Sequence, residues 1–101
     1  MAEVVFINCF EVPAGREQVF LELWHQIDDH MRAQPGYRWV RLHRSLDPAA
    51  TFRYVNVAGW DSAEQHSAGH DEKFHRLLAQ EAWQEFPSLP AIYTVEVADQ
   101  A

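Results

Sequence analysis

The amino-acid sequence predicts an α+β domain in which helices cover one face of a single antiparallel sheet. Three observations predict this fold. Segments rich in β-branched and aromatic residues are interspersed with segments whose apolar residues recur every three or four positions. Proline, glycine or a helix-capping residue stands at most boundaries between them. In chain order, the segments are strand, helix, strand, strand, helix and strand.

The chain begins with a strand followed by a helix. The segment "EVVFINCFEV", residues 3–12, is the expected strand, and Pro13 and Gly15 follow it. A helix is expected from Arg16, because its apolar residues form one stripe: Phe20, Leu23, Trp24, Ile27 and Met31. "QPGY", residues 34–37, ends this helix, since a proline disfavours helical backbone in the residue before it.

The remaining strands are expected at residues 37–44 ("YRWVRLHR"), 52–60 and 91–97 ("AIYTVEV"). Asp47 and Pro48 form the turn between the first two of these. A sheet with this order of strands has its first and third strands side by side.

The second helical region is predicted from its caps. Ser62 and Gln65 have the spacing of a capping box, so a helix should begin there. Gly69 is expected to interrupt this helix, and Asp71 to cap a second segment that runs to about Gln80. The complete order, βαββαβ, is the ferredoxin-like arrangement, an antiparallel sheet with both helices on one face.

Alternation along the expected strands sorts their residues into two sets. The small aliphatic set is expected beneath the helices and consists of Val5, Ile7, Cys9, Val40, Leu42, Val55 and Val57. The aromatic and polar set is expected on the helix-free face and consists of Phe6, Asn8, Phe10, Tyr37, Trp39, Arg41, His43, Phe52, Tyr54, Asn56, Ala58 and Trp60. Large exposed apolar faces are rare on monomers. We therefore expect a homodimer through the open face, with a ligand pocket between the sheet and its cover.

Asn8 and Asn56 would lie on adjacent strands of this aromatic face. A buried amide without a hydrogen-bond partner costs about 1–3 kcal/mol. Neighbouring backbone could satisfy each asparagine. Two asparagines together with Arg41 and His43 favour a ligand pocket instead, because such pockets are mostly apolar with a few polar groups.

Composition narrows the class of protein. The 101 residues fit one domain, spanning 1–101. The net charge of −7 disfavours nucleic acid and anionic membrane as partners. Cys9 is the only cysteine, so no intramolecular disulfide is possible and a reducing, cytoplasmic location is expected. The apolar run at residues 4–7 lacks a preceding basic segment and is expected to be a strand, not a signal peptide.

Three stretches resemble the antibiotic biosynthesis monooxygenase (ABM) family: "INCFEVPAG" (7–15), "QPGY" (34–37) and "VNVAGWDSAE" (55–64). The resemblance runs from about residue 3 to residue 97. It implies a ferredoxin-like domain that pairs sheet to sheet into a dimeric α+β barrel.

One branch of this family oxidises hydroxyanthrone-like compounds to quinones with O₂ and no cofactor. Its members use an Asn with a Trp four residues later, matched by Asn56 and Trp60, and a first-strand Asn, matched by Asn8. The resemblance thus implies a cofactor-independent monooxygenase of a phenolic or anthrone-like (polyketide-type or quinol) substrate. The asparagines would bind the substrate oxygen and Trp60 would stack on its ring. The expected remainder of the binding surface is Phe6, Phe10, Trp39, Tyr54 and His43.

The proton acceptor is expected to be a histidine. Some members carry a Tyr six residues after the Trp, where this chain has His66. Histidine titrates near neutral pH, so His66 or His43 is the expected base. His66 and His70 also have the i,i+4 spacing of a metal-binding pair, but no Cys or carboxylate completes a set, so no metal site is expected.

Two alternative functions are considered. A second branch degrades haem, using a Trp nine residues beyond the strand-ending Trp, where this chain has Gly69. That branch also uses a first-strand Asn, which Asn8 matches, and a later His iron ligand, whose expected position holds Leu78 or Ala79 in this chain. Asn8 is therefore the one match to that branch. A protein of this fold could also be a non-catalytic or stress-related dimer that binds a small aromatic or a quinone, since fold does not fix function.

Overall fold

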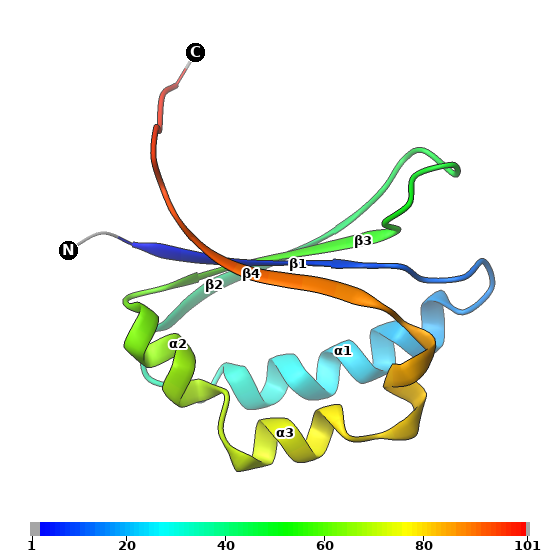
Figure 1. The fold of residues 1–101 in the computed structure, drawn as a ribbon, viewed down its shortest axis with the longest axis horizontal. Coiled ribbons are helices and arrows are strands. Elements are labelled where there is room, and N and C mark those ends of the chain that lie inside the picture. Colours follow the sequence, from blue (N-terminus) through cyan, green and yellow to red (C-terminus); the bar gives the residue numbers. More distant parts are fainter. Residues whose placement is uncertain (1–2, 101) are drawn as a thin grey trace.

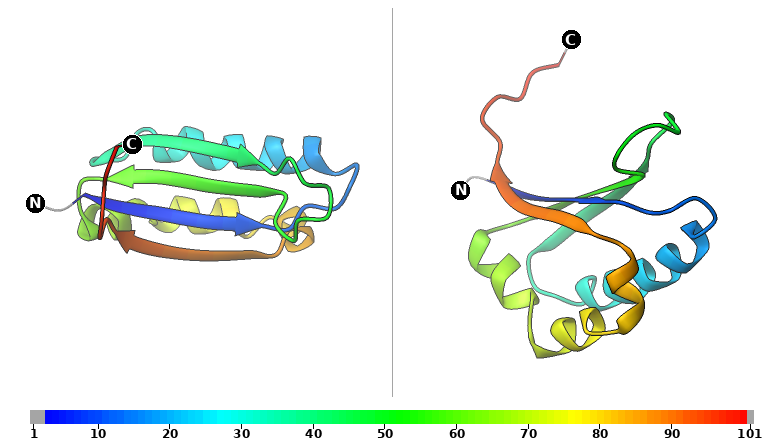
Figure 2. Two further views of the ribbon diagram at one scale, coloured as in Figure 1. Left: turned by 90° about the horizontal axis from the view of Figure 1, so that it is seen from above. Right: turned by 45° about the vertical axis from the view of Figure 1, so that its right-hand side comes forward.

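The structure, a computed structural model, describes residues 3–100. Its elements, in chain order, are β1 Val4–Phe10, α1 Glu17–Met31, β2 Tyr37–Arg44, β3 Tyr54–Trp60, α2 Ala63–Gly69, α3 Glu72–Leu78, the 3₁₀ helix η1 Glu81–Glu85 and β4 Ser88–Thr94. The strands form one antiparallel sheet in the order β2-β3-β1-β4. Figure 1 shows the helices together on one face of the sheet, and Figure 2 shows the four strands side by side. The predicted ferredoxin-like α+β fold is confirmed.

The caps expected in the second helical region are present. Ser62 Oγ accepts a hydrogen bond from the backbone N–H of Gln65 over 3.1 Å, and α2 ends at Gly69. Asp71 Oδ1 accepts one from the backbone N–H of Phe74 over 2.9 Å and caps α3. Because these caps satisfy N–H groups that have no partner within a helix, two short helices follow one another.

The last strand lies earlier in the chain than expected, at Ser88–Thr94 instead of residues 91–97. Pro90 favours a later start, since proline cannot donate to a strand ladder. β4, however, is an edge strand, and an edge strand can hold a proline whose nitrogen faces away from its neighbour. Pro90 accordingly lies within the strand, opposite Asn8.

The expected assignment of the two faces of the sheet is wrong for β1 and β3, whereas Trp39, Arg41 and His43 of β2 lie on the open face as expected. Phe10, Tyr54 and Trp60 of the aromatic set lie under the helices, with exposed fractions of 6%, 5% and 0%. On β1 and β3 the grouping of residues by face is nevertheless correct, because Asn8 pairs with Asn56 and the two therefore share one face. Alternation cannot tell which face the helices cover. Covering the aromatic face buries larger side chains, and therefore more apolar surface, than covering the aliphatic face.

Strand β2 carries an irregularity that changes its alternation. Tyr37 lies opposite Trp60, but Trp39 lies opposite the adjacent residue of β3, so the register shifts between Tyr37 and Trp39. A bulge inserts one extra residue and turns all later side chains to the other face. Tyr37 is therefore beneath the helices, whereas Trp39, Arg41 and His43 lie on the open face.

The hydrophobic core lies between α1 and the part of the sheet where β1 ends. Its buried members are Phe10, Phe20, Leu23, Tyr54 and Phe86. Phe20 is fully buried and stacks on Tyr54, with 4.9 Å between their ring centroids. This core holds α1 against the sheet. Of the helices within residues 3–100, none combines the length and the apolar character needed to cross a membrane.

Candidate active site

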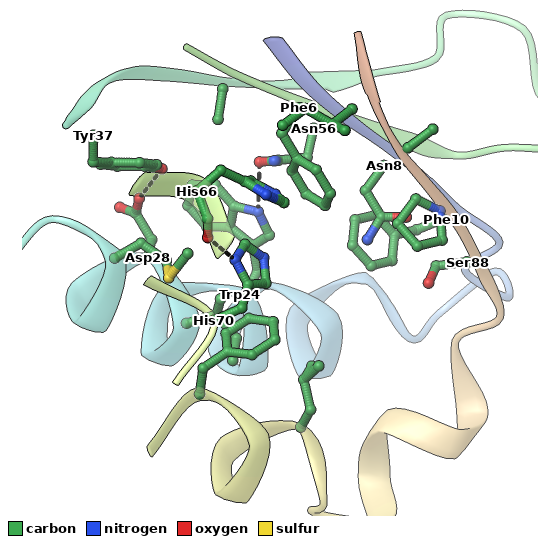
Figure 3. A pocket seen from close by; sticks show the side chains of 18 of the residues that line it. Phe6, Asn8, Phe10, Trp24, Asp28, Tyr37, Asn56, His66, His70 and Ser88 are labelled. Carbon is green, nitrogen blue, oxygen red and sulfur yellow. Dashed lines mark hydrogen bonds between the residues drawn. The ribbon is translucent and has the colours of Figure 1, made fainter. Parts of the chain in front are cut away.

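A cavity lies between the sheet and the helices, beside the core. Its volume is about 530 Å³, within the range typical of ligand pockets. The lining is mainly aromatic and aliphatic, and its polar side chains are Asn8, Asp28, Tyr37, Asn56, His66, His70 and Ser88. Figure 3 shows these side chains converging from the sheet and from the helices. The cavity lies on the helix-covered face of the sheet, so the expected position of the pocket, between the open face and a second subunit, is corrected.

Asn56 is held in place by an indole. It is 8% exposed, and the Nε1–H of Trp24 on α1 donates a hydrogen bond to its Oδ1 atom over 3.0 Å (Figure 3). This bond fixes which end of the amide is oxygen, because an indole N–H can only donate. The Nδ2 hydrogens of Asn56 are then left to donate to a ligand. The hydrogen-bond partner that the buried amide of Asn56 requires is thus the side chain of Trp24 on α1.

Asn8 lies directly opposite Asn56 on the neighbouring strand. Its Oδ1 atom is buried and has no hydrogen-bond partner within residues 3–100. Such an acceptor costs about 1–3 kcal/mol when it is left unpaired, so Asn8 is a candidate to receive a donor from a ligand. Both asparagines line the same cavity, as the alternation predicts.

Trp60 forms a rigid wall of the cavity. It is fully buried, and its ring centroid lies 5.0 Å from that of Tyr37 and 5.5 Å from that of His66. Gly69 packs closely on the same indole, since a Cβ atom added there would lie 2.7 Å from Trp60 Cη2. The glycine therefore lets α2 approach the sheet, and this approach brings the histidines of α2 to the cavity.

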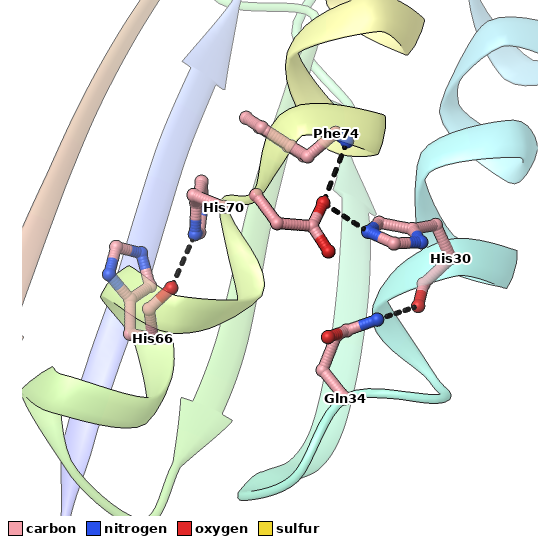
Figure 4. Close-up of polar contacts among 6 residues, drawn as sticks. His30, Gln34, His66, His70 and Phe74 are labelled. Atoms are coloured by element: carbon pink, nitrogen blue, oxygen red, sulfur yellow. Dashed lines mark hydrogen bonds and ion pairs between the residues drawn. The ribbon is translucent and has the colours of Figure 1, made fainter.

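His66 and His70 lie side by side, with 4.1 Å between their ring centroids. The Nδ1 atom of His70 lies 2.6 Å from the backbone oxygen of His66 (Figure 4). Burial, and secondarily the neighbouring His70, lowers the pKa of His66 to about 4. Burial is also the main cause that lowers the pKa of His70. Both imidazoles are therefore neutral at neutral pH and can accept a proton.

Asp28 of α1 is 4% exposed and lies at the cavity with two partners. Tyr37 Oη–H donates to its Oδ1 atom over 3.1 Å, and Arg32 Nε–H donates to its Oδ2 atom over 2.7 Å. Burial, followed by the charge of Asp28, raises the pKa of Tyr37. Tyr37 thus stays protonated and serves as a donor to Asp28 instead of as a base.

Helix α3 is tied to α1 through Asp71. His30 Nε2 lies 2.9 Å from Asp71 Oδ1, the same oxygen that caps α3 at Phe74 (Figure 4). The backbone N–H of Phe74 is the main cause that lowers the pKa of Asp71. Phe74 in turn lies against His70, with 4.3 Å between ring centroids. This connection fixes the part of the cavity wall beside His70.

The family model described as antibiotic biosynthesis monooxygenase matches residues 4–86. The chain belongs to the ABM family. The match covers the three motifs that carry the resemblance in the sequence, and it supports assignment of this ABM protein as a monooxygenase. No curated protein matches the chain.

Solved structures resemble this ABM chain over nearly its whole length. A protein from Shewanella loihica PV-4, provisionally assigned as a monooxygenase, is 34% identical with a TM-score of 0.82, covering 96% of this chain and 97% of that one. SnoaB, a cofactor-independent oxygenase from Streptomyces nogalater, is 22% identical with a TM-score of 0.80, covering 97% of each chain. A heme-degrading protein from Mycobacterium tuberculosis is 22% identical with a TM-score of 0.66, covering 99% and 98%. At 22% identity, the last two similarities show the fold alone.

The structure brings most of the expected site residues of this ABM protein together, namely Phe6, Asn8, Phe10, Asn56, Trp60 and His66, which all line the cavity. Tyr54 lies in the core instead. Trp39 and His43 lie on the open face, because the bulge in β2 reverses their direction. His43 Nδ1 lies 3.2 Å from the backbone oxygen of Val55, on the far side of the sheet from the cavity. Of the two histidines expected as the base, only His66 is therefore at the cavity.

Several residues that line the cavity of this ABM protein are not predicted from the sequence, among them Trp24, Asp28, His70 and Phe74. Trp24 falls on the apolar stripe of α1, which predicts a core residue, and spacing alone gives no sign of its hydrogen bond. His70 carries a signal, since it lies four residues after His66, but that spacing is typical of a metal-binding pair as well. Within residues 3–100, no group of three or more His, Cys, Asp or Glu is placed to hold a metal ion.

Proposed function

We propose that this ABM-family protein is a cofactor-independent monooxygenase that oxidises a phenolic or anthrone-like aromatic substrate with O₂. The observation that carries the proposal is an aromatic cavity in which Trp24 orients Asn56 so that its amide N–H groups can meet a substrate oxygen. Membership in a family of monooxygenases supports the class of reaction. In this proposal residues 1–101 act as one domain, and the single cysteine favours the cytoplasm.

In this mechanism the substrate supplies the electrons. Removal of a proton from a phenol or an anthrone leaves an electron-rich anion, which can pass an electron to O₂ without a flavin or a metal. Overall, a CH₂ group and O₂ become a carbonyl group and water, so O₂ is the one oxidant required. The protein has to take up the proton, for which the neutral His66 and His70 are suited, and to keep water from the reactive intermediate.

Each cavity residue then has a role. Asn56 Nδ2–H would donate to the oxygen that becomes negative, as an oxyanion hole does, and Asn8 lies opposite to assist it. Trp60 would form the wall against which the substrate ring lies, and Phe6 and Phe10 line the same cavity. Fixed positions for both ring and oxygen lower the entropy that must be lost on reaching the transition state.

Oxygen consumption with a panel of hydroxyanthrones, dihydronaphthoquinones and naphthols tests the proposal. Asn56→Ala removes the donor and should lower kcat by about 10²–10³-fold. Trp60→Phe should also lower turnover, because it alters the wall. The matched control is Trp39→Phe, which makes the same replacement on the open face and should leave turnover unchanged. Equal rates in the wild type and in both cavity variants would contradict the assignment of the site.

The alternatives make different predictions in the same assays. A non-catalytic binding dimer would quench its tryptophan fluorescence with members of the panel and consume no oxygen with any of them. Haem degradation would require saturable haem binding with a shift of the Soret band. Because this chain has Gly69, and Leu78 or Ala79, where the haem-degrading branch has its Trp and His, we expect no such shift.

The homodimer is also part of the proposal, through the open face of the sheet. That face carries the aliphatic set of β1 and β3, and on β4 it carries Leu89 and Tyr93, which are 65% and 51% exposed. Residues 95–100 extend toward the same side (orange to red in Figure 1). Sedimentation velocity should show a dimer for the wild type and a monomer for Val57→Glu, with Ala79→Glu on the helical side as the control. A monomeric wild type would contradict this arrangement.

A further inference from the structure

The hydrogen bond between His70 and the backbone of His66 fixes the tautomer of His70. The backbone oxygen of His66 can only accept, so the Nδ1 atom of His70, 2.6 Å away, carries the hydrogen. A neutral imidazole has one N–H group, and the Nε2 atom of His70 is therefore left with a free lone pair. Within residues 3–100 this atom makes no hydrogen bond that would occupy the lone pair.

His66 differs from His70 in access to the cavity. The Nε2 atom of His66 is sealed from solvent and has no hydrogen-bond partner within residues 3–100. Its ring is enclosed by Phe6, Trp60 and His70, at centroid distances of 5.0, 5.5 and 4.1 Å. A substrate can reach the Nε2 atom of His66 only if these three rings move aside. Within residues 3–100, the buried side-chain atoms without a hydrogen-bond partner are Asn8 Oδ1, His66 Nε2 and Trp83 Nε1, and the equally unpaired Nε2 atom of His70 is not among them.

We propose that Nε2 of His70 is the atom that takes the proton from the substrate, and that His66 is a positioning residue acting through its backbone oxygen. This assignment rests on the proposed function. In the step, the substrate O–H or C–H bond breaks, an N–H bond forms at Nε2, and the electron pair stays on the substrate. The substrate anion is then held by the Nδ2–H of Asn56, whose orientation Trp24 fixes. His70 thus accepts the proton, and Asn56 donates a hydrogen bond to the anion that the same proton transfer creates.

The surroundings of His70 suit a base that must be neutral before it reacts. Burial is the main cause that lowers its pKa, and His75 and His30 act in the same direction. The hydrogen bond to His66 and the charge of Asp71 act in the opposite direction. From the sheet, the aromatic rings of Phe6 and Trp60 face His70, at 5.8 and 6.4 Å between centroids. The base is consequently active at neutral pH, and its activity is lost as the pH falls through the lowered pKa.

His70 also has a structural role that the test must separate from this one, since its bond to His66 satisfies a carbonyl at the end of α2. His70→Asn keeps an N–H near the position of Nδ1 and removes Nε2, so the helix end is preserved while the base is lost. The control is His75→Asn, the same replacement at an exposed position outside the cavity lining. His70→Asn should lower kcat by about 10²–10⁴-fold and abolish the acid limb of the pH–rate profile. His75→Asn should leave kcat near the wild-type value and retain the acid limb, moved only to higher pH because His75 lowers the pKa of His70. Wild-type kcat and an unchanged acid limb in His70→Asn would overturn the assignment.

A second measurement needs no oxidation and separates this assignment from the proposed function. The probe is 4-nitrophenol, whose absorption distinguishes the phenol from the phenolate. Bound to the wild type under anaerobic conditions, it should ionise at lower pH than in solution, and His70→Asn should reduce that shift, because only the donor from Asn56 remains. Equal shifts in both proteins would overturn the assignment even if oxygen consumption is observed.

If His70→Asn does not fold or does not bind the probe, the wild type itself gives the answer. In protein labelled with ¹⁵N at histidine, the probe should move the Nε2 resonance of His70 to the protonated position and leave that of His66 in place. An unchanged His70 resonance with bound phenolate would overturn the assignment. If no compound of the panel causes oxygen consumption but the His70 resonance moves, the proposed oxidation is refuted and the assignment of His70 as proton acceptor is retained.

Discussion

Replacing Gly69 by alanine should destabilise the protein, although alanine is the better helix former. Gly69 is the last residue of α2 and has no positive φ, so its backbone does not require glycine. A Cβ atom at this position would lie 2.7 Å from Cη2 and 3.4 Å from Cζ3 of Trp60. Trp60 is fully buried, and the rings of Tyr37 and His66 prevent it from moving away.

The expected magnitude is the difference between two opposing effects. Overpacking a well-packed interior costs about 1–3 kcal/mol. Alanine in place of a helical glycine gains about 0.5–1 kcal/mol through the entropy of the unfolded chain. The free energy of unfolding should therefore fall by about 0–2.5 kcal/mol, with the middle of that range at about 1 kcal/mol. For a domain of this size, each kcal/mol lowers Tm by about 4–8 °C.

Urea titration followed by circular dichroism measures this loss, and the Trp60→Phe background tests its cause. Phenylalanine has no atoms equivalent to Cη2 and Cζ3, so Gly69→Ala should be neutral or stabilising in that background. The coupling between the two sites is then obtained from the double-mutant cycle. The reasoning is refuted if Gly69→Ala is more stable than the wild type, or if its effect is the same in both backgrounds.

Three other perturbations should have measurable effects. Trp24→Phe leaves the buried Oδ1 atom of Asn56 without its donor and should lower the free energy of unfolding in urea by about 1–3 kcal/mol. Tyr37→Phe removes a hydrogen bond to the carboxylate of Asp28 and should cost about 1.5–3 kcal/mol in the same assay. Because the pKa of His66 is about 4 in the folded protein and 6.5 ordinarily, the unfolded chain binds more protons between these values. Stability should therefore be lost as the pH falls from 6.5 to about 4, and His66→Asn should flatten that dependence in urea titrations at a series of pH values.

The order of elements and their caps could be predicted because they depend on local sequence. Ser62 and Asp71 cap α2 and α3 as expected, since a capping side chain needs only the backbone N–H groups that follow it. The pairing of Asn8 with Asn56 likewise follows from alternation within strands and from the strand order of the fold. These features need no knowledge of what packs on the sheet.

The face covered by helices and the bulge in β2 could not be predicted, because each depends on long-range packing. Alternation has the same period on both faces, so it cannot state which one is buried. One inserted residue then reverses all later positions of β2 and removes Trp39 and His43 from the site. The role of Trp24 depends on its contact with Asn56 of β3, and the role of His70 depends on its hydrogen bond to the backbone oxygen of His66. Residue spacing predicts neither contact.

The cavity lies on the helix-covered face of the sheet, opposite the open face proposed for dimerisation. If two copies join through the open face, each copy keeps a separate catalytic unit. The activity of dimers assembled from mixtures of wild-type and Asn56→Ala chains should then fall in proportion to the share of substituted chains. Substrate saturation should be hyperbolic, since each cavity lies on the far side of its sheet from the proposed dimer contact. Assembly and turnover can thus be altered independently, by substitutions on opposite faces of the same four strands.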